Sequence, residues 1–111
     1  MEFTEFSYNG MWFREMKFYK TGDIKQGHIH NRDHITLFAY GIFRITDANT
    51  GDIIAERLEG PSRFIVKKDI AHSIELLSDH GIAYCVENVP CGETMVTKNI
   101  TKRTENVNPI R

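Results

Sequence analysis

Runs of aromatic and β-branched residues recur along the chain and are separated by Gly, Pro, Asn and Asp turns. The run at 11–19 (MWFREMKFY) is rich in aromatics and lacks a helical stripe, which favours a strand. The runs at 42–46 and 52–58 flank 47–51 (DANTG), a loop with Asn and Gly where a hairpin needs them. Further strands are expected at 26–30, 34–40, 63–66, 73–77 and 82–88. No long helical pattern carries a capping signal, so the sequence predicts an all-β fold.

The domain organisation follows from the length of the chain. With 111 residues it is long enough for one hydrophobic core and too short for two independently folding domains, so we expect a single domain over 1–111. From Gly92 onward Thr, Asn, Lys and Arg replace most apolar residues. This change predicts a strand or arm at 93–97 and a loosely held C-terminal tail at 98–111.

Composition and charge exclude several classes of protein. With 41% hydrophobic and 26% charged residues the chain falls in the ordinary globular range, and its net charge of −1 is unsuited to binding nucleic acid. The N-terminus resembles no secretory signal and no stretch approaches a membrane span, so a cytoplasmic location with no membrane partner is expected. Cys85 and Cys91 lack metal or redox spacing and are expected to be buried or idle thiols.

Histidines supply the candidate chemistry. His28 and His30 form an H-x-H pair in an expected strand, where alternate side chains project from the same face roughly 7 Å apart. His34 follows the corner at 31–33, and His72 lies two hairpins downstream, where a closed or rolled sheet brings distant strands together. The hypothesis is one metal ion held by four imidazoles; the alternative is that some of them are plain surface or core residues. His80 is interpreted as a turn residue.

The spacing of these residues resembles the first motif of the cupin superfamily. In this chain Gly22, five residues, His28-x-His30, three residues, His34, six residues and Gly41 follow one another in that order, over about 22–41. The motif usually carries glutamate at the third ligand position, where this chain has His34. The resemblance therefore implies a small single-domain cupin with an all-histidine metal site.

A second cupin motif is expected over about 60–76. His72 stands where that motif places its lone histidine, although 67–71 reads KKDIA in place of the usual Pro-x-Gly turn. The resemblance covers roughly 22–86. It implies a double-stranded β-helix, that is, a jelly-roll barrel.

The ligand type narrows the choice of cofactor to a divalent transition metal. Imidazole suits zinc, copper, iron and nickel, whereas magnesium and calcium prefer oxygen ligands. Small cupins with all-histidine sites add manganese, so the resemblance implies Mn, Fe, Ni, Cu or Zn. Four neutral ligands offset none of the charge on the metal, which leaves the centre more electrophilic than one with a glutamate ligand.

The possible functions follow from the open coordination positions. Four ligands on a six-coordinate metal leave two positions for a bidentate small molecule, or for substrate and dioxygen. Resemblance to cupin dioxygenases implies an oxygenase acting on a small oxygen-donor substrate such as an enol or a diketone. A non-catalytic metal-binding or small-ligand-binding module, a structural tetrahedral zinc site and a metal-free sugar epimerase or isomerase remain open.

Strand parity divides the residues around the site into two faces. Thr36, Phe38 and Tyr40 share the parity of His34 and are expected to line the interior pocket. The opposite parity carries 35, 37 and 39 (Ile, Leu and Ala), and a second copy of the chain would cover this face, as in dimeric small cupins. The alternative is burial beneath the N-terminal strand or the tail. Other candidate groups are Arg44, Arg57 and Arg63 for a carboxylate substrate, and Tyr84 and Glu87 as acid or base.

Overall fold

Strands account for all the regular secondary structure in the described part of the chain. The structure is a computed structural model that describes residues 1–27, 29, 32–88 and 96–101, the last range as backbone only. In chain order the strands are β1 (Glu2–Tyr8), β2 (Met11–Phe18), β3 (Ile24–Lys25), β4 (His34–Tyr40), β5 (Ile42–Asp47), β6 (Ile53–Glu59), β7 (Ser62–Val66), β8 (His72–Leu76), β9 (Gly81–Asn88) and β10 (Val96–Thr101). The predicted all-β class is confirmed. Nothing helical in these ranges is long and apolar enough to cross a membrane.

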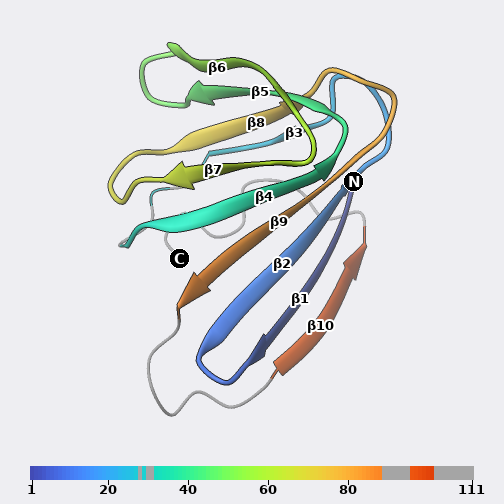
Figure 1. Cartoon of the computed structure of the whole chain (residues 1–111), viewed down its shortest axis with the longest axis vertical. Helices are drawn as coiled ribbons and strands as arrows, with labels where there is room; N and C mark the ends of the chain where they lie inside the picture. The colour runs from blue at the N-terminus through green and yellow to red at the C-terminus, as the bar shows by residue number, and fades with distance from the viewer. Residues whose placement is uncertain (28, 30–31, 89–95, 102–111) are drawn as a thin grey trace.

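The strands form two antiparallel sheets. One has six strands in the order β10-β1-β2-β9-β4-β7, and the other has four in the order β3-β8-β5-β6. In Figure 1 the six-stranded sheet extends from β10 at the lower right to β7 at mid-height, and the four-stranded sheet lies in the upper part of the view. Neighbours such as β2 and β9 are far apart in sequence, so distant segments meet inside one rolled structure.

Two hairpins illustrate the local turn chemistry. The β1–β2 turn places Asn9 and Gly10 at positive φ (52° and 83°), the conformation that an Asn-Gly turn favours. No strand was predicted over β1, although Asn9-Gly10 is a local hairpin signal. The predicted hairpin over β5 and β6 is confirmed: Asp47 Oδ1 accepts hydrogen bonds from the backbone N–H groups of Asn49 and Thr50, and Gly51 has a φ of 82°.

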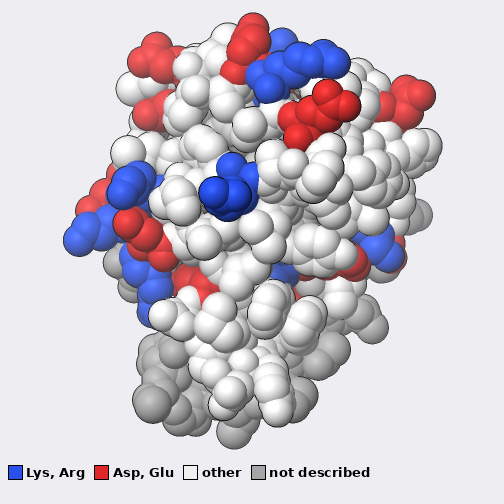
Figure 2. All heavy atoms as spheres, viewed as in Figure 1, with Lys and Arg blue, Asp and Glu red and all other residues white. Residues whose placement is uncertain are grey.

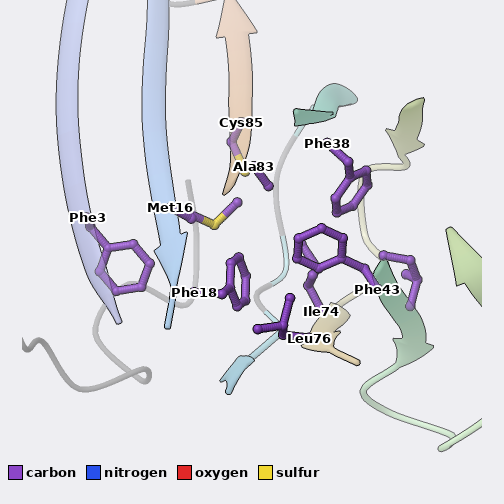
Figure 3. Close-up of a cluster of buried hydrophobic side chains, with 10 residues drawn as sticks. Phe3, Met16, Phe18, Phe38, Phe43, Ile74, Leu76, Ala83 and Cys85 are labelled. Carbon is purple, nitrogen blue, oxygen red and sulfur yellow. The ribbon is translucent and has the colours of Figure 1, made fainter. Parts of the chain in front are cut away.

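The hydrophobic core fills the space between the sheets. Phe43 lies at its centre, with its ring 4.7 Å from that of Phe38 and 5.1 Å from that of Phe18, measured between centroids. Figure 3 shows these rings beside Met16 and Leu76, which come from opposite sheets. This packing fills the interior between the two sheets around Phe43.

Two expected elements have different limits in the structure. The run at 26–30 was predicted to be a strand, whereas β3 covers Ile24–Lys25. Of the described residues in that run, 26, 27 and 29, only Ile29 forms an isolated bridge, and residues 28 and 30 lie outside the described ranges. At the C-terminus β10 begins later than the expected strand at 93–97 and continues into the segment expected to be a loose tail. The strand extends to Thr101 because Val96–Thr101 pairs residue by residue with Glu2–Ser7 of β1 in antiparallel register. Residues 102–111 lie outside the described range.

Candidate functional site

His34 and His72 each begin a strand, and both strands begin at the same end of the interior. His34, the first residue of β4, is buried and pairs with Val66 of β7. His72, the first residue of β8, is half-buried and pairs with Asp47 of β5. We call the part of the interior next to His34 and His72 the histidine end.

Phe64 contacts His72 and lies on the strand that pairs with the strand of His34. Its ring lies edge-on to that of His72, with 5.4 Å between centroids and 78° between planes. On β7 Phe64 pairs with Thr36, while His34 pairs with Val66, two residues further along the same strand. Because alternate residues of a strand share a face, the side chains of His34 and Thr36 project together toward the interior. The structure therefore brings the sequence-distant His72 to the same end as His34.

Gly27, the residue before the H-x-H pair, lies beside the backbone of His72. The Gly27 N–H donates to Ser73 Oγ at 3.1 Å, and a Cβ at position 27 would lie 2.9 Å from the backbone N and C atoms of His72. The same Cβ would lie 2.8 Å from the Ala48 side chain. Such separations are too short for any side chain, so only glycine allows this approach. Gly27 is the residue that precedes the H-x-H pair in the sequence.

His28 and His30 themselves lie outside the described residues. Within the ranges that the structure does describe, no three His, Cys, Asp or Glu side chains are grouped so that they could hold an ion. The set of His28, His30, His34 and His72 therefore stays a prediction, with two members placed at one end of the interior.

The environment of His72 suits a neutral imidazole. Burial lowers its pKa below the ordinary value of 6.5, and the nearby carboxylate of Asp47 opposes that shift. Its Nδ1 atom is buried and has no hydrogen-bond partner in the described part of the chain. A neutral ring with a buried nitrogen of this kind has the donor chemistry that a transition metal requires, so the residue fits a ligand role.

Solved structures of cupins share this architecture. A cupin superfamily protein from Desulfitobacterium hafniense is 14% identical and superposes with a TM-score of 0.61, covering 76% of this chain and 72% of its own. KdgF from Halomonas sp. is 19% identical with a TM-score of 0.62, over 76% of this chain and 75% of its own. The chain has a cupin fold. No family model matches the sequence, and no curated protein matches it either.

The fold is also similar to that of an enzyme, oxalate oxidase. Oxalate oxidase is 14% identical with a TM-score of 0.61 over 72% of this chain, and the match covers 42% of the larger protein. At such identities the likeness shows the fold alone. It confirms the jelly roll that the motif spacing implied.

In this cupin fold the segment between His30 and His34 is tied to two neighbouring elements. Asp33 Oδ1 accepts a hydrogen bond from the Lys68 N–H at 2.7 Å, which lowers the pKa of the Asp33 carboxyl, and Lys67 Nζ lies 3.6 Å from Oδ2. Arg32 Nη1 donates to the Asn88 carbonyl at 2.5 Å. These contacts join the segment to the loop before His72 and to the end of β9.

The three expected pocket residues lie in two different environments. Thr36 and Phe38 point inward as expected, but Phe38 packs in the hydrophobic core. Tyr40 is 49% exposed, because the β4–β9 register shifts between Phe38 and Tyr40 and interrupts the alternation. It borders an open depression of about 470 Å³ away from the histidine end, lined by Tyr40, Gly41, Ile42, Glu59, Gly60, Ser78, Asp79 and His80.

The other candidate groups are mostly on the surface. Arg44 pairs with Glu75 at 3.2 Å and with Glu56 at 3.7 Å, and Arg63 is exposed. Tyr84 projects outward and donates to Glu15 Oε2 at 2.8 Å, which raises the pKa of the phenol above 10.0.

Of the two buried charged residues described in the six-stranded sheet, Arg14 was not predicted from the sequence, and Glu87 was predicted only as a possible acid or base. Arg14 is buried against Glu5, and Glu87 is buried on β9. The available signal was parity: Arg14 shares a face with the apolar Met16, and Glu87 shares one with Cys85, which is buried as predicted.

Proposed function

We propose that this chain is a metal-binding cupin that holds one divalent transition metal through His28, His30, His34 and His72 at the histidine end. The observation that carries the proposal is the approach of Gly27, the residue before the H-x-H pair, to the backbone of the sequence-distant His72. Manganese, iron, nickel, copper and zinc are all compatible with imidazole ligands.

The proposed reaction is an oxygenase-type conversion of a small oxygen-donor molecule. When bound, the metal would supply Lewis acidity and a place for two oxygen donors of the substrate. The chain's own residues shape the site: Thr36 and Phe64 form its inner wall, and Phe64 holds the His72 ring edge-on. The likeness to oxalate oxidase, which has also been solved with the substrate analogue glycolate, supports a small substrate with paired oxygen atoms.

Elemental analysis of protein purified without added metal tests the proposed site. We expect one equivalent of a transition metal in the native chain and a large loss of metal in His28→Ala and in His72→Ala. His80→Ala is the matched control, since His80 lies exposed beside the depression away from the histidine end. Equal metal content in all four proteins would refute the ligand assignment.

A catalytic site and a closed structural zinc site predict different behaviour toward small molecules. Oxygen consumption is measured for the metal-loaded protein with β-diketones, enols and oxalate. Turnover that disappears in His72→Ala supports the oxygenase. If the protein holds zinc, resists chelators and changes no spectrum on addition of these molecules, the site is structural.

We further propose that the chain forms a homodimer through the outer face of the six-stranded sheet. An apolar row crosses five adjacent strands in ladder register, and its members are Ile65, Ile35, Val86, Phe13 and Phe6. The rings of Phe6 and Phe13 are stacked 4.8 Å apart. Figure 2 shows a broad uncharged area over the lower part of the face seen in Figure 1.

The size of this face suits a second copy of the chain. Five strands are about 19 Å across, and strands of this length run for about 20–25 Å, so the flat area is about 400–500 Å² before side-chain relief is added. A standard interface buries about 800 Å² per partner, and monomers rarely expose apolar patches of more than a few hundred Å². The N-terminal strand does not cover the row, because β1 lies in the same sheet.

Light scattering after size exclusion tests the dimer. We expect a native dimer and a monomer for Ile65→Glu. Ile53→Glu is the control, because Ile53 is 54% exposed on the other sheet and Ile65 is 47% exposed. A native monomer, or a dimer that survives Ile65→Glu, would show that this face is not the interface.

A further inference from the structure

Glu87 is a buried carboxylate on the inner face of β9. Along this strand Ala83, Cys85 and Glu87 are buried while the residues between them are partly exposed, so Glu87 occupies a position that the alternation assigns to the interior. Burying a carboxylate away from water costs several kcal/mol unless charged or polar groups compensate for it. A carboxylate at this position is therefore expected to interact with charged or polar groups in the interior.

The strand register brings Glu87 to His34. The ladder of β4 and β9 pairs Ile35 with Val86 and Thr36 with Cys85, and in both pairs the residue numbers add to 121. The next pair in this antiparallel register is His34 with Glu87. Their exposures are 5% and 4%, so both side chains are buried at neighbouring positions of the same inner face.

Arg32 links the same carboxylate to the histidine-bearing segment. Its Nε atom lies 3.4 Å from Glu87 Oε2, and its Nη1 atom donates to the Asn88 carbonyl. Arg32 lies two residues after His30 and two before His34. The end of β9 therefore contacts the first-motif segment through a charged pair as well as through the neighbouring strand.

The proposed ligand set of four imidazoles indicates how this carboxylate could act. Four neutral imidazoles leave the full charge of a divalent ion uncompensated, and a carboxylate close to a ligating histidine orients the ring and increases its basicity. The β4–β9 register and the ion pair with Arg32 place the Glu87 carboxylate next to His34, so we assign it a position beside the ligands.

We propose that Glu87 is the positioning carboxylate of the histidine site, which orients the His34 ring from the neighbouring strand β9. This inference rests on the proposed function.

Cobalt(II) binding to the full chain tests the proposal. The protein is stripped with a chelator, and its affinity for cobalt(II) is measured by competition with a chromophoric chelator, together with the visible spectrum of the bound ion. We expect Glu87→Gln to bind cobalt(II) about 10–100-fold more weakly than the native chain, as outer-shell substitutions do. Glu87→Asp, which keeps the charge, should recover part of the affinity.

Two controls separate positioning from simple structural support. Glu15→Gln removes the same charge from the outer face of β2, where Glu15 accepts from Tyr84, and should leave the affinity unchanged. Urea unfolding of the stripped proteins reports any loss of stability separately. If Glu87→Gln lowers only the stability, or binds cobalt(II) within about twofold of the native chain, the carboxylate supports the fold and the proposal is wrong. A native chain that binds no metal would overturn the proposed function and this inference together.

Discussion

Replacing Glu5 with glutamine tests the buried ion pair that joins β1 to β2. Arg14 is 3% exposed, and its Nε and Nη2 atoms donate to Glu5 Oε2 at 2.8 and 2.5 Å. The guanidinium carbon also lies 5.4 Å from the ring centroids of Phe3 and Trp12. Its charge is therefore desolvated on the inner face, with one carboxylate accepting both hydrogen bonds.

The expected cost follows from this burial. Removing one partner of a buried ion pair typically costs about 3–5 kcal/mol, because the remaining charge stays in a poorly solvated place. The two aromatic rings remain and each can offset about 0.5–2 kcal/mol, and glutamine keeps an oxygen acceptor. We therefore expect Glu5→Gln to lower the free energy of unfolding by about 3 kcal/mol, the lower end of that range.

Urea unfolding of a double-mutant cycle measures the effect. For a urea m-value of about 1–3 kcal/mol/M, a 3 kcal/mol loss lowers the midpoint by about 1–3 M. Arg14→Met and the double variant complete the cycle, and the double variant should be more stable than the sum of the single losses predicts, because no charge is left stranded. Lys17→Met is the control, since its 3.8 Å pair with Glu15 is partly exposed and should contribute less than about 1 kcal/mol. A loss of less than about 1 kcal/mol in Glu5→Gln, or strict additivity, would refute the reasoning.

Three further outcomes follow from the structure. The hydrogen bond from Tyr84 to Glu15 raises the phenol pKa above 10.0, so its stabilisation is complete below pH 10 and is lost as the pH rises through the folded-state value. Urea titrations at graded pH should show a shallower alkaline fall in stability for Tyr84→Phe, and an unchanged slope would contradict this. Gly27→Ala should fold but bind metal at least about tenfold more weakly, a loss of about 1.4 kcal/mol in binding free energy, because the added Cβ would push Gly27 away from the His72 backbone. Native affinity in the competition assay would count against the site. Metal at 100 times its Kd should raise the unfolding free energy by about 2.7 kcal/mol, and His72→Ala should abolish that gain in calorimetry.

The residue pattern alone determined the fold class and most of the strands. Alternation and turn residues act over a few neighbouring positions, so β2, the β5–β6 hairpin and β9 could be predicted from the sequence. The resemblance of the histidine spacing to the first cupin motif likewise implied the jelly roll. The Asn9-Gly10 turn is a local signal of the same kind, and it favours a hairpin that includes β1.

The surroundings of the candidate site depended on the tertiary structure. No local pattern shows that Glu87 lies opposite His34, that Glu5 meets Arg14, or that the register shifts before Tyr40, because each depends on which distant strands pair and in which register. The approach of Gly27 to His72 is a contact of the same kind. A strand encodes its own two faces, whereas its neighbours are chosen by the packing of the whole barrel. For this reason the sequence could predict candidate histidines, while the pairing of the charged residues near them depended on the tertiary structure.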